Sequence, residues 1–300
     1  MRQMRDSMAL VVLFGALGTL IAFGCDHQRV EESATEKLRF TTGERTVVEV
    51  RIDDGRVEVV GGAPGVVEVV FNNRARAADS AGARSLLENI RAEAVQDGNV
   101  VRVKARSGIG SAVTLGGTYW TDVAIRVPPE STELDIRTED GRVEIEAVSG
   151  TIVAETGDGR IQIADVEGTV RLRTGDGSIT GTNLTGDFDV LSDDGRIRLD
   201  GSFGQLKVVT ADGSVRVSGR DMTTISNDWS IRTSDGSIEL SLPASLDAEL
   251  DATTGDGRVI NNLSRFEGTE HRNRVKGTLG TGGGLILVTT MDGRIMLKES

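Results

Sequence analysis

Residues 140–211 read DGRVEIEAVSGTIVAETG, DGRIQIADVEGTVRLRTG, DGSITGTNLTGDFDVLSD and DGRIRLDGSFGQLKVVTA, four consecutive units of equal length. Each unit begins with Asp-Gly, and Val or Ile stands two positions after that glycine. Apolar and polar residues alternate in both halves of a unit, and a period of two is typical of β-strands. Each unit is therefore predicted to contain two short strands joined by corners, one of which is the Asp-Gly pair.

Two architectures fit this repeat. In a parallel β-solenoid each strand pairs with its counterpart one coil further on, about 4.8 Å away. In an antiparallel meander the Asp-Gly pairs form hairpin turns. A solenoid stacks like positions on one another, and seven columns keep their residue class over the four units. The sequence therefore favours an all-β fold, a single-stranded parallel β-solenoid (β-helix) with about 18 residues per coil.

The repeat predicts the domain organisation. Further Asp-Gly corners occur outside the four units, at Gly55, Gly213, Gly236, Gly257 and Gly293. The last interval is twice the length of the repeat, so a corner is predicted to be missing near Val275. Residues 131–300 are assigned to the solenoid. Residues 46–130 are predicted to form a β-rich part that caps it, with one short helix within 78–95, where Leu86, Leu87 and Ile90 have helical spacing.

Residues 1–24 have the features of a secretory signal peptide, with early arginines, an apolar run over 8–23 and the small residue Gly24. The apolar run is shorter than the roughly 20 residues of a membrane-spanning helix, and an uncleaved membrane anchor is the alternative. Cys25, the only cysteine, follows at once and resembles the lipidated cysteine of bacterial lipoproteins. Residues 25–45 are polar and are predicted to be a flexible tether.

The composition excludes several functional classes. The net charge of −12 argues against a nucleic-acid partner, because phosphate binding needs a basic face. Two histidines and one cysteine leave little for zinc, haem or histidine-dependent catalysis. No catalytic residue, metal or cofactor is therefore assigned. The scarcity of aromatic residues also argues against a core built on aromatic anchors.

The corners have the pattern T-x-D-G-[RS]-[IV], as in Thr156–Ile161 and Thr174–Ile179. With the valine-rich opening around Asp54-Gly55, the helix near 80–95 and the strand that ends at Pro128, this pattern resembles the bacterial putative-adhesin family of β-strand-repeat domains of unknown function, akin to the head domains called GIN. The resemblance covers residues 46–300. It implies a β-helical body on the cell envelope with an adhesive role.

The corner columns are the candidate site. Asp-Gly is ordinary turn chemistry, which explains the aspartates without a metal. Stacked carboxylates repel one another, and arginines beside them would offset this repulsion. The resulting edge is either a solvated, charge-balanced face or a polar strip that faces a ligand, with the candidate residues Asp158, Arg160, Asp176, Asp194, Arg196 and Asp212. The threonines three residues before each corner glycine are predicted to form a structural ladder. Tyr119, Trp120 and Trp229 are interpreted as packing residues, with stacking on sugar rings as the alternative.

These features together predict a non-enzymatic, lipid-anchored protein of the bacterial cell envelope, a scaffold or binding surface for cell-wall polymers or other cells. Its expected partners are the membrane, through Cys25, and a glycan, a cell-wall polymer or an envelope protein. Two alternatives stay open: a β-helix polysaccharide lyase or hydrolase, and a regulatory partner of an envelope-stress sensor.

Overall fold

The computed structural model describes residues 29–43, 45–106, 117–130, 132–221, 223 and 225–300. The predicted signal peptide and Cys25 lie outside these residues. The described chain consists of strands and one helix, α1 (Ser80–Glu88), which confirms the all-β prediction. The strands are β1 (Val30–Thr41), β2 (Thr46–Ile52), β3 (Arg56–Gly61), β4 (Val66–Ala77), β5 (Arg91–Asp97), β6 (Val100–Arg106), β7 (Thr118–Val127), β8 (Thr132–Thr138), β9 (Arg142–Thr156), β10 (Ile161–Thr174), β11 (Ile179–Ser192), β12 (Ile197–Val209), β13 (Val215–Gly219), β14 (Trp229–Arg232), β15 (Ile238–Leu242), β16 (Ala248–Thr254), β17 (Arg258–Asn262), β18 (Phe266–His271), β19 (Arg274–Leu279), β20 (Leu285–Thr290) and β21 (Arg294–Glu299).

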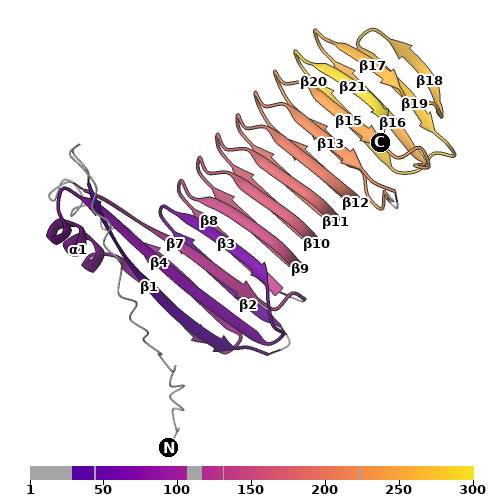
Figure 1. Ribbon diagram of the computed structural model, residues 1–300. Coiled ribbons are helices and arrows are strands. Elements are labelled where there is room, and N and C mark those ends of the chain that lie inside the picture. The colour runs from indigo at the N-terminus through magenta and orange to yellow at the C-terminus, as the bar shows by residue number, and fades with distance from the viewer. Residues whose placement is uncertain (1–28, 44, 107–116, 131, 222, 224) are drawn as a thin grey trace, which may run out of the picture.

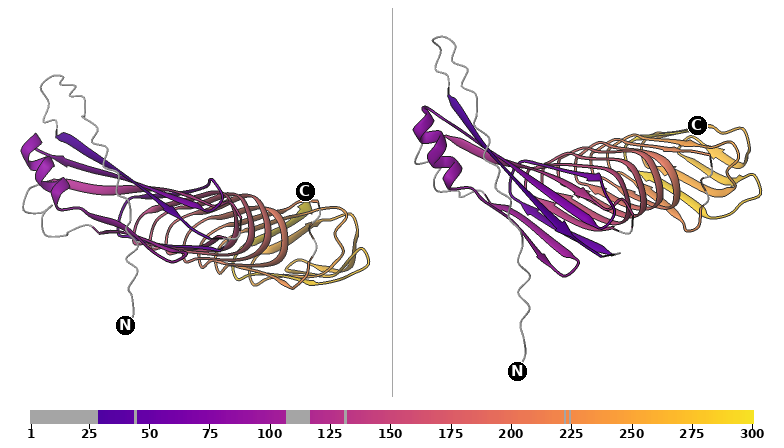
Figure 2. Two further views of the ribbon diagram at one scale, coloured as in Figure 1. Left: turned by 90° about the horizontal axis from the view of Figure 1, so that it is seen from below. Right: turned by 60° about the horizontal axis from the view of Figure 1, so that its bottom comes forward.

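The middle of the molecule is a stack of flattened coils that form a rod (Figure 1). Strands β9, β10, β11 and β12 pair in parallel, and Ile161 of β10 lies beside Val143 of β9 and Ile179 of β11, its counterparts in the two adjacent repeats. Each of these strands bends at its middle, so its first half lies in one layer and its second half in another. Figure 2 shows the coils as nested loops along the rod. The two halves of each coil belong to two layers. The first layer holds the residues that follow each Asp-Gly corner, and the second layer holds the residues that precede the next corner.

The sheet is mixed, because antiparallel pairs finish both ends of the rod. At one end β4 pairs antiparallel with β1 and β7, and β5 with β6. At the other end β19 pairs antiparallel with β16 and β18. Uniform parallel pairing, as the repeat predicts, therefore does not extend over the whole chain.

The spatial order of the coils differs from their order in the sequence. The last two strands return into the stack, because β20 lies between β14 and β16 and β21 lies between β15 and β17, all in parallel pairs. Within residues 225–300 no corner lies near Val275, as predicted, but the reason is not a regular coil that lacks its corner. Residues 266–279 contain no coil; they form the antiparallel strands β18 and β19, of which β19 pairs with β16 and β18 pairs with β19. At the other end β2 is inserted between β6 and β8 in the same manner.

The core lies between the two layers and is mainly aliphatic. Alternate side chains of each strand point inward, as in β10, where Ile161, Ile163, Val170 and Leu172 are at most 2% exposed. One aromatic cluster interrupts this pattern: Phe203 makes edge-to-face contacts with Phe188 (5.4 Å) and Trp229 (5.9 Å). The composition gave no reason to expect these rings at the centre of the core.

The N-terminal part corrects the predicted tether and shows where the predicted helix ends. The segment predicted as a flexible tether over 25–45 contains β1, which pairs with β4 along all its 12 residues. Backbone hydrogen bonds hold this edge strand, and Phe40 is its one buried residue, so the hydropathy of β1 resembles that of a tether. The helix predicted within 78–95 ends at Glu88, and residues 91–97 form β5. Asp79 caps α1 by accepting a hydrogen bond from the Gly82 N–H (2.7 Å), and α1 packs on β4 and β1 rather than over the coils.

Candidate functional site

The Asp-Gly corners stack directly on one another, backbone against backbone. Successive corners are joined by hydrogen bonds, such as those from the Gly157 N–H to the Glu139 carbonyl (2.6 Å) and from the Gly175 N–H to the Gly157 carbonyl (2.5 Å). A Cβ placed on Gly177 would lie 1.9 Å from the carbonyl oxygen of Gly159. The same contact gives the order of the corner glycines along the rod: Gly55, Gly141, Gly159, Gly177, Gly195, Gly213, Gly236, Gly293, Gly257.

The threonine column supports these corners from inside. The Thr156 hydroxyl donates to the carbonyl oxygens of Gly141 (3.1 Å) and Glu139 (3.3 Å) in the preceding coil. It also accepts a hydrogen bond from the Gly159 N–H of its own corner (3.2 Å). The predicted ladder is therefore present in a different form, since each hydroxyl bonds backbone groups instead of the next hydroxyl. The buried members are Thr138, Thr156, Thr174, Ser192, Thr210, Thr233, Thr254 and Thr290.

We expect Thr156→Val to destabilise the protein by about 1–3 kcal/mol, because the Gly159 N–H and the Gly141 carbonyl lose a buried partner that valine cannot replace. Thr156→Ser keeps the hydroxyl and is expected to cost less. Urea unfolding followed by circular dichroism measures both free energies. A valine variant that is at least as stable as the serine variant would contradict the stabilising role of the hydroxyl.

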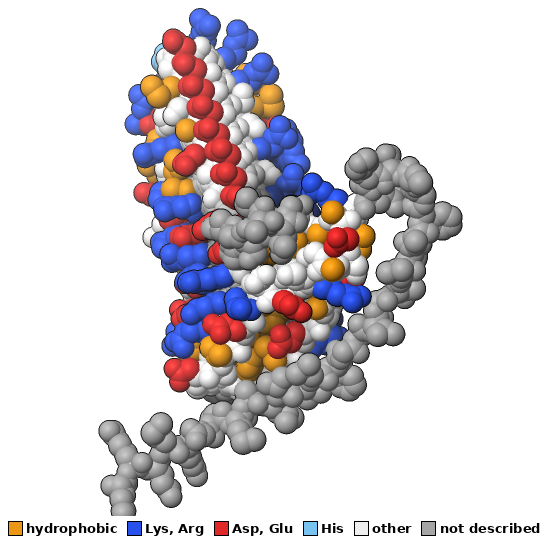
Figure 3. All heavy atoms as spheres, turned by 90° about the vertical axis from the view of Figure 1, so that its left-hand side faces the viewer, with side chains coloured by type: hydrophobic (Ala, Val, Ile, Leu, Met, Phe, Trp, Pro, Cys, Tyr) orange, Lys and Arg blue, Asp and Glu red, His pale blue; other side chains and the backbone are white. Residues whose placement is uncertain are grey.

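The aspartates of the corners form one acidic file along an edge of the rod. Its members, in spatial order, are Asp54, Asp140, Asp158, Asp176, Asp194, Asp212, Asp235, Asp292 and Asp256, and all are exposed. Figure 3 shows acidic side chains in a continuous row on this edge, with basic side chains on both sides of it. Burial raises the pKa of Asp54, and the negative charges of Asp140 and Asp53 raise it further. The carboxylate of Asp140 therefore acts on that of Asp54, its neighbour at this end of the file.

The structure brings all six predicted strip residues to this edge. Asp158, Asp176, Asp194 and Asp212 lie in four successive corners, with Arg160 and Arg196 one residue after the glycine of theirs. Within the described residues, no ion pair within 4.0 Å joins Arg160 or Arg196 to the file. Arg160 instead donates to the hydroxyl of Ser178 in the next coil (3.0 Å). The carboxylates of the file thus face solvent.

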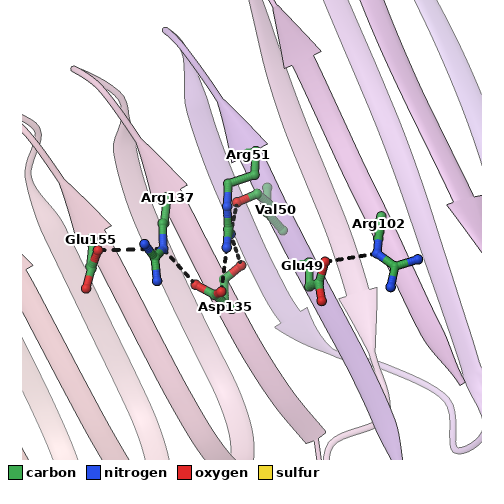
Figure 4. Close-up of polar contacts among 7 residues, drawn as sticks. All are labelled: Glu49, Val50, Arg51, Arg102, Asp135, Arg137 and Glu155. Carbon is green, nitrogen blue, oxygen red and sulfur yellow. Dashed lines mark hydrogen bonds and ion pairs between the residues drawn. The ribbon is translucent and has the colours of Figure 1, made fainter.

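The outer face of the second layer differs, because its charges are paired across strands (Figure 4). Asp135 of β8 contacts Arg51 of β2 and, at 3.3 Å, Arg137, which also lies 3.6 Å from Glu155. Burial would raise the pKa of Asp135, but hydrogen bonds and ion pairs with Arg51 and Arg137 outweigh it and hold that pKa below its usual value. Near β2, β8 and β9, the charged side chains on the outer face of the second layer are therefore largely paired with one another.

The second predicted corner of each unit lies opposite the acidic file, and it contains a left-handed residue that the sequence analysis did not identify. Ala147, Asp165 and Asn183 occupy the same position in three coils with φ of 52–55°, a left-handed conformation. The sequence offers one indication of this conformation. Asp and Asn stand at two of the three positions, and these residues tolerate a left-handed backbone better than alanine does.

The remaining candidate residues have structural or surface positions. Trp229 is fully buried and therefore cannot stack on a sugar ring. Trp120 is half-buried, with the Arg76 guanidinium 5.9 Å from its ring centre. Among the residues that the structure describes, no cluster of three or more His, Cys, Asp or Glu could hold a metal ion. Within the same residues, no helix has the length and apolarity needed to span a membrane.

The fold and its edge define a class of protein: a two-layer β-rod of stacked coils that presents one repeated, charged file. The chain belongs to the Toastrack DUF4097 family, whose model matches residues 74–298. The resemblance to a family of β-strand-repeat domains of unknown function is thus confirmed.

Three solved structures are similar to this chain. One is a putative cell adhesion protein from Clostridium sporogenes, with 15% identity, 90% of this chain and 100% of that chain covered, and a TM-score of 0.32. Another is a putative adhesin from Bacteroides fragilis, with 9% identity, coverage of 89% and 97%, and a TM-score of 0.42. The third is a putative adhesin from Parabacteroides distasonis, with 10% identity, the same coverage and a TM-score of 0.28. No curated protein matches the sequence.

Proposed function

We propose that this protein is a non-enzymatic component of the bacterial cell envelope, anchored by a lipid on Cys25, whose β-rod binds cell-wall or surface polymers along the acidic file. The observation that carries the proposal is the exposed row of corner aspartates, one in each coil. Carboxylates accept hydrogen bonds from sugar hydroxyls, and neighbouring arginines can donate to them. Weak contacts repeated along a rod add up on a polymeric ligand.

A binding role fits the file better than hydrolysis. Acid-base cleavage of a glycosidic bond needs two carboxyl groups in different environments, one of which holds a proton. The aspartates of the file instead repeat one exposed position from coil to coil. The envelope location rests on the sequence features of residues 1–25.

Co-sedimentation of the purified protein with isolated bacterial cell walls tests this function. The variant Asp158→Asn/Asp176→Asn/Asp194→Asn/Asp212→Asn removes four charges and keeps turn-forming Asn-Gly corners. We expect it to lower wall retention by roughly tenfold, because the contacts act together. The matched control neutralises four exposed glutamates outside the file, with Glu36, Glu93, Glu133 and Glu267 each replaced by Gln. Absence of wild-type retention, or an equal loss in the control, would contradict the proposal.

A further inference from the structure

A groove lies on the outer face of the first layer, where β12, β13, β15 and β21 run side by side. Its volume is about 470 Å³, within the range of roughly 300–1,000 Å³ that is usual for small-ligand sites. Arg196, Arg198, Arg216 and Arg294 line it together with Ser214 and Ser237. We call it the arginine groove.

The groove is hollow because short residues lie between long ones. The residue after the corner glycine is, in four neighbouring coils, Arg196, Ser214, Ser237 and Arg294. Two arginines therefore stand three strand spacings apart, about 14 Å between their backbones. Between them Ser214 and Ser237 leave an open floor, and their hydroxyl groups, which bond no other described residue, can donate hydrogen bonds to a ligand.

Positive charge in the groove exceeds what the protein itself neutralises. Among the residues that line the groove, Glu239 carries a carboxylate, and this carboxylate already binds basic side chains of the protein. It accepts from Arg216 Nε (2.9 Å) and Nη2 (2.6 Å) and contacts Lys298 Nζ at 2.6 Å. The hydrogen bond with Lys298 lowers the pKa of Glu239, burial opposes this, and Arg216 lowers it further. Glu239 is therefore a charged and occupied partner.

Three arginines of the groove have no such partner. Among the described residues, Arg196, Arg198 and Arg294 make no side-chain hydrogen bond and no ion pair within 4.0 Å. Arg198 moreover lies directly beside Arg216 on the neighbouring strand, so two like charges face each other across one strand spacing. A bound anion would relieve this repulsion.

We infer that the arginine groove binds an oxyanion group, a carboxylate, sulfate or phosphate, carried by an acidic polysaccharide. The planar guanidinium group matches such oxygens with two parallel hydrogen bonds. Met296, which also lines the groove, offers an apolar surface to the ring that carries the anion. The acidic file next to the groove repels densely charged chains, so the preferred ligand has anionic groups separated by neutral sugars. The inference deepens the proposed function, on which it rests, by naming the polymer class.

The test uses the full chain in a non-ionic detergent and fluorescent hyaluronan oligosaccharides, which carry one carboxylate on every second sugar. We expect saturable binding that weakens when salt is raised to about 0.5 M, because surface charges are then screened. Arg196→Glu/Arg294→Glu is expected to raise the Kd by roughly tenfold or more, and neutral dextran is expected not to bind. Competition by inorganic phosphate, sulfate or acetate identifies the preferred oxyanion.

The second layer offers a matched control. Arg173 and Arg232 also stand three strand spacings apart, but Leu191 and Val209 fill the space between them. Arg173→Glu/Arg232→Glu makes the same change of charge and is expected to leave the Kd within about twofold of the wild-type value. Circular dichroism checks that both variants are folded.

Three outcomes would overturn the inference: no hyaluronan binding, an equal effect of the two double variants, or no effect of either. If walls are still retained through the acidic file in those cases, the proposed function stands and the groove alone is excluded. If the folded wild-type protein is neither retained by cell walls nor able to bind hyaluronan, the proposed function and the inference about the groove are both excluded.

Discussion

Gly177→Ala is expected to destabilise the protein by about 4 kcal/mol or more, enough to prevent folding in many domains. The added Cβ would lie 1.9 Å from the carbonyl oxygen of Gly159 and 2.6 Å from its carbonyl carbon. Both atoms belong to the backbone of the neighbouring coil, so no side-chain rotation relieves the overlap. The two coils would have to separate, and the hydrogen bonds between their corners would lengthen or break.

Gly98→Ala is the control for this prediction. Gly98 has φ of +61°, and nothing lies within 4 Å of its added Cβ. Gly98→Ala should therefore destabilise the protein only through backbone strain, by about 1–2 kcal/mol. Urea denaturation followed by circular dichroism, together with the yield of soluble protein, compares the two variants. A Gly177→Ala protein as stable as the Gly98→Ala protein would show that the corners are not in backbone contact.

The second large effect is expected at Trp229. Trp229→Ala should cost about 3–5 kcal/mol, because the side chain is fully buried and its removal leaves a cavity beside Phe203. Among the residues that the structure describes, the indole N–H has no hydrogen-bond partner. Trp229→Phe keeps a ring in the cluster and removes this unsatisfied donor, so we expect a loss of only about 1 kcal/mol.

Trp120→Ala serves as the comparison, since Trp120 is half-buried at the N-terminal end of the rod. We expect it to cost less than Trp229→Ala, because a smaller cavity remains and the contact with Arg76 contributes about 0.5–1 kcal/mol. Thermal unfolding followed by far-ultraviolet circular dichroism does not depend on tryptophan fluorescence and suits all three variants. An equal loss at both tryptophans would argue against the buried aromatic cluster.

Much of the candidate site followed from the repeat. Because the corner aspartates recur with a fixed spacing, their stacking into one file could be predicted, and the structure places Asp158, Asp176, Asp194 and Asp212 there. The arginine groove could not be predicted in the same way. It needs Arg294 beside Ser237, and these residues become neighbours only because β21 inserts between β15 and β17.

The sequence by itself determined the local geometry: strands by the period of two, corners by Asp-Gly, and the neighbours of β9 to β12 by the regular repeat. Tertiary structure alone decided how the ends of the rod are finished. Strands β1, β20 and β21 pair with segments far away in the chain, through backbone groups that are the same in every residue. The pattern of side chains shows which face of a strand is buried. It does not show with which of several similar strand edges the strand pairs, so the pairing depends on the packing of the whole rod.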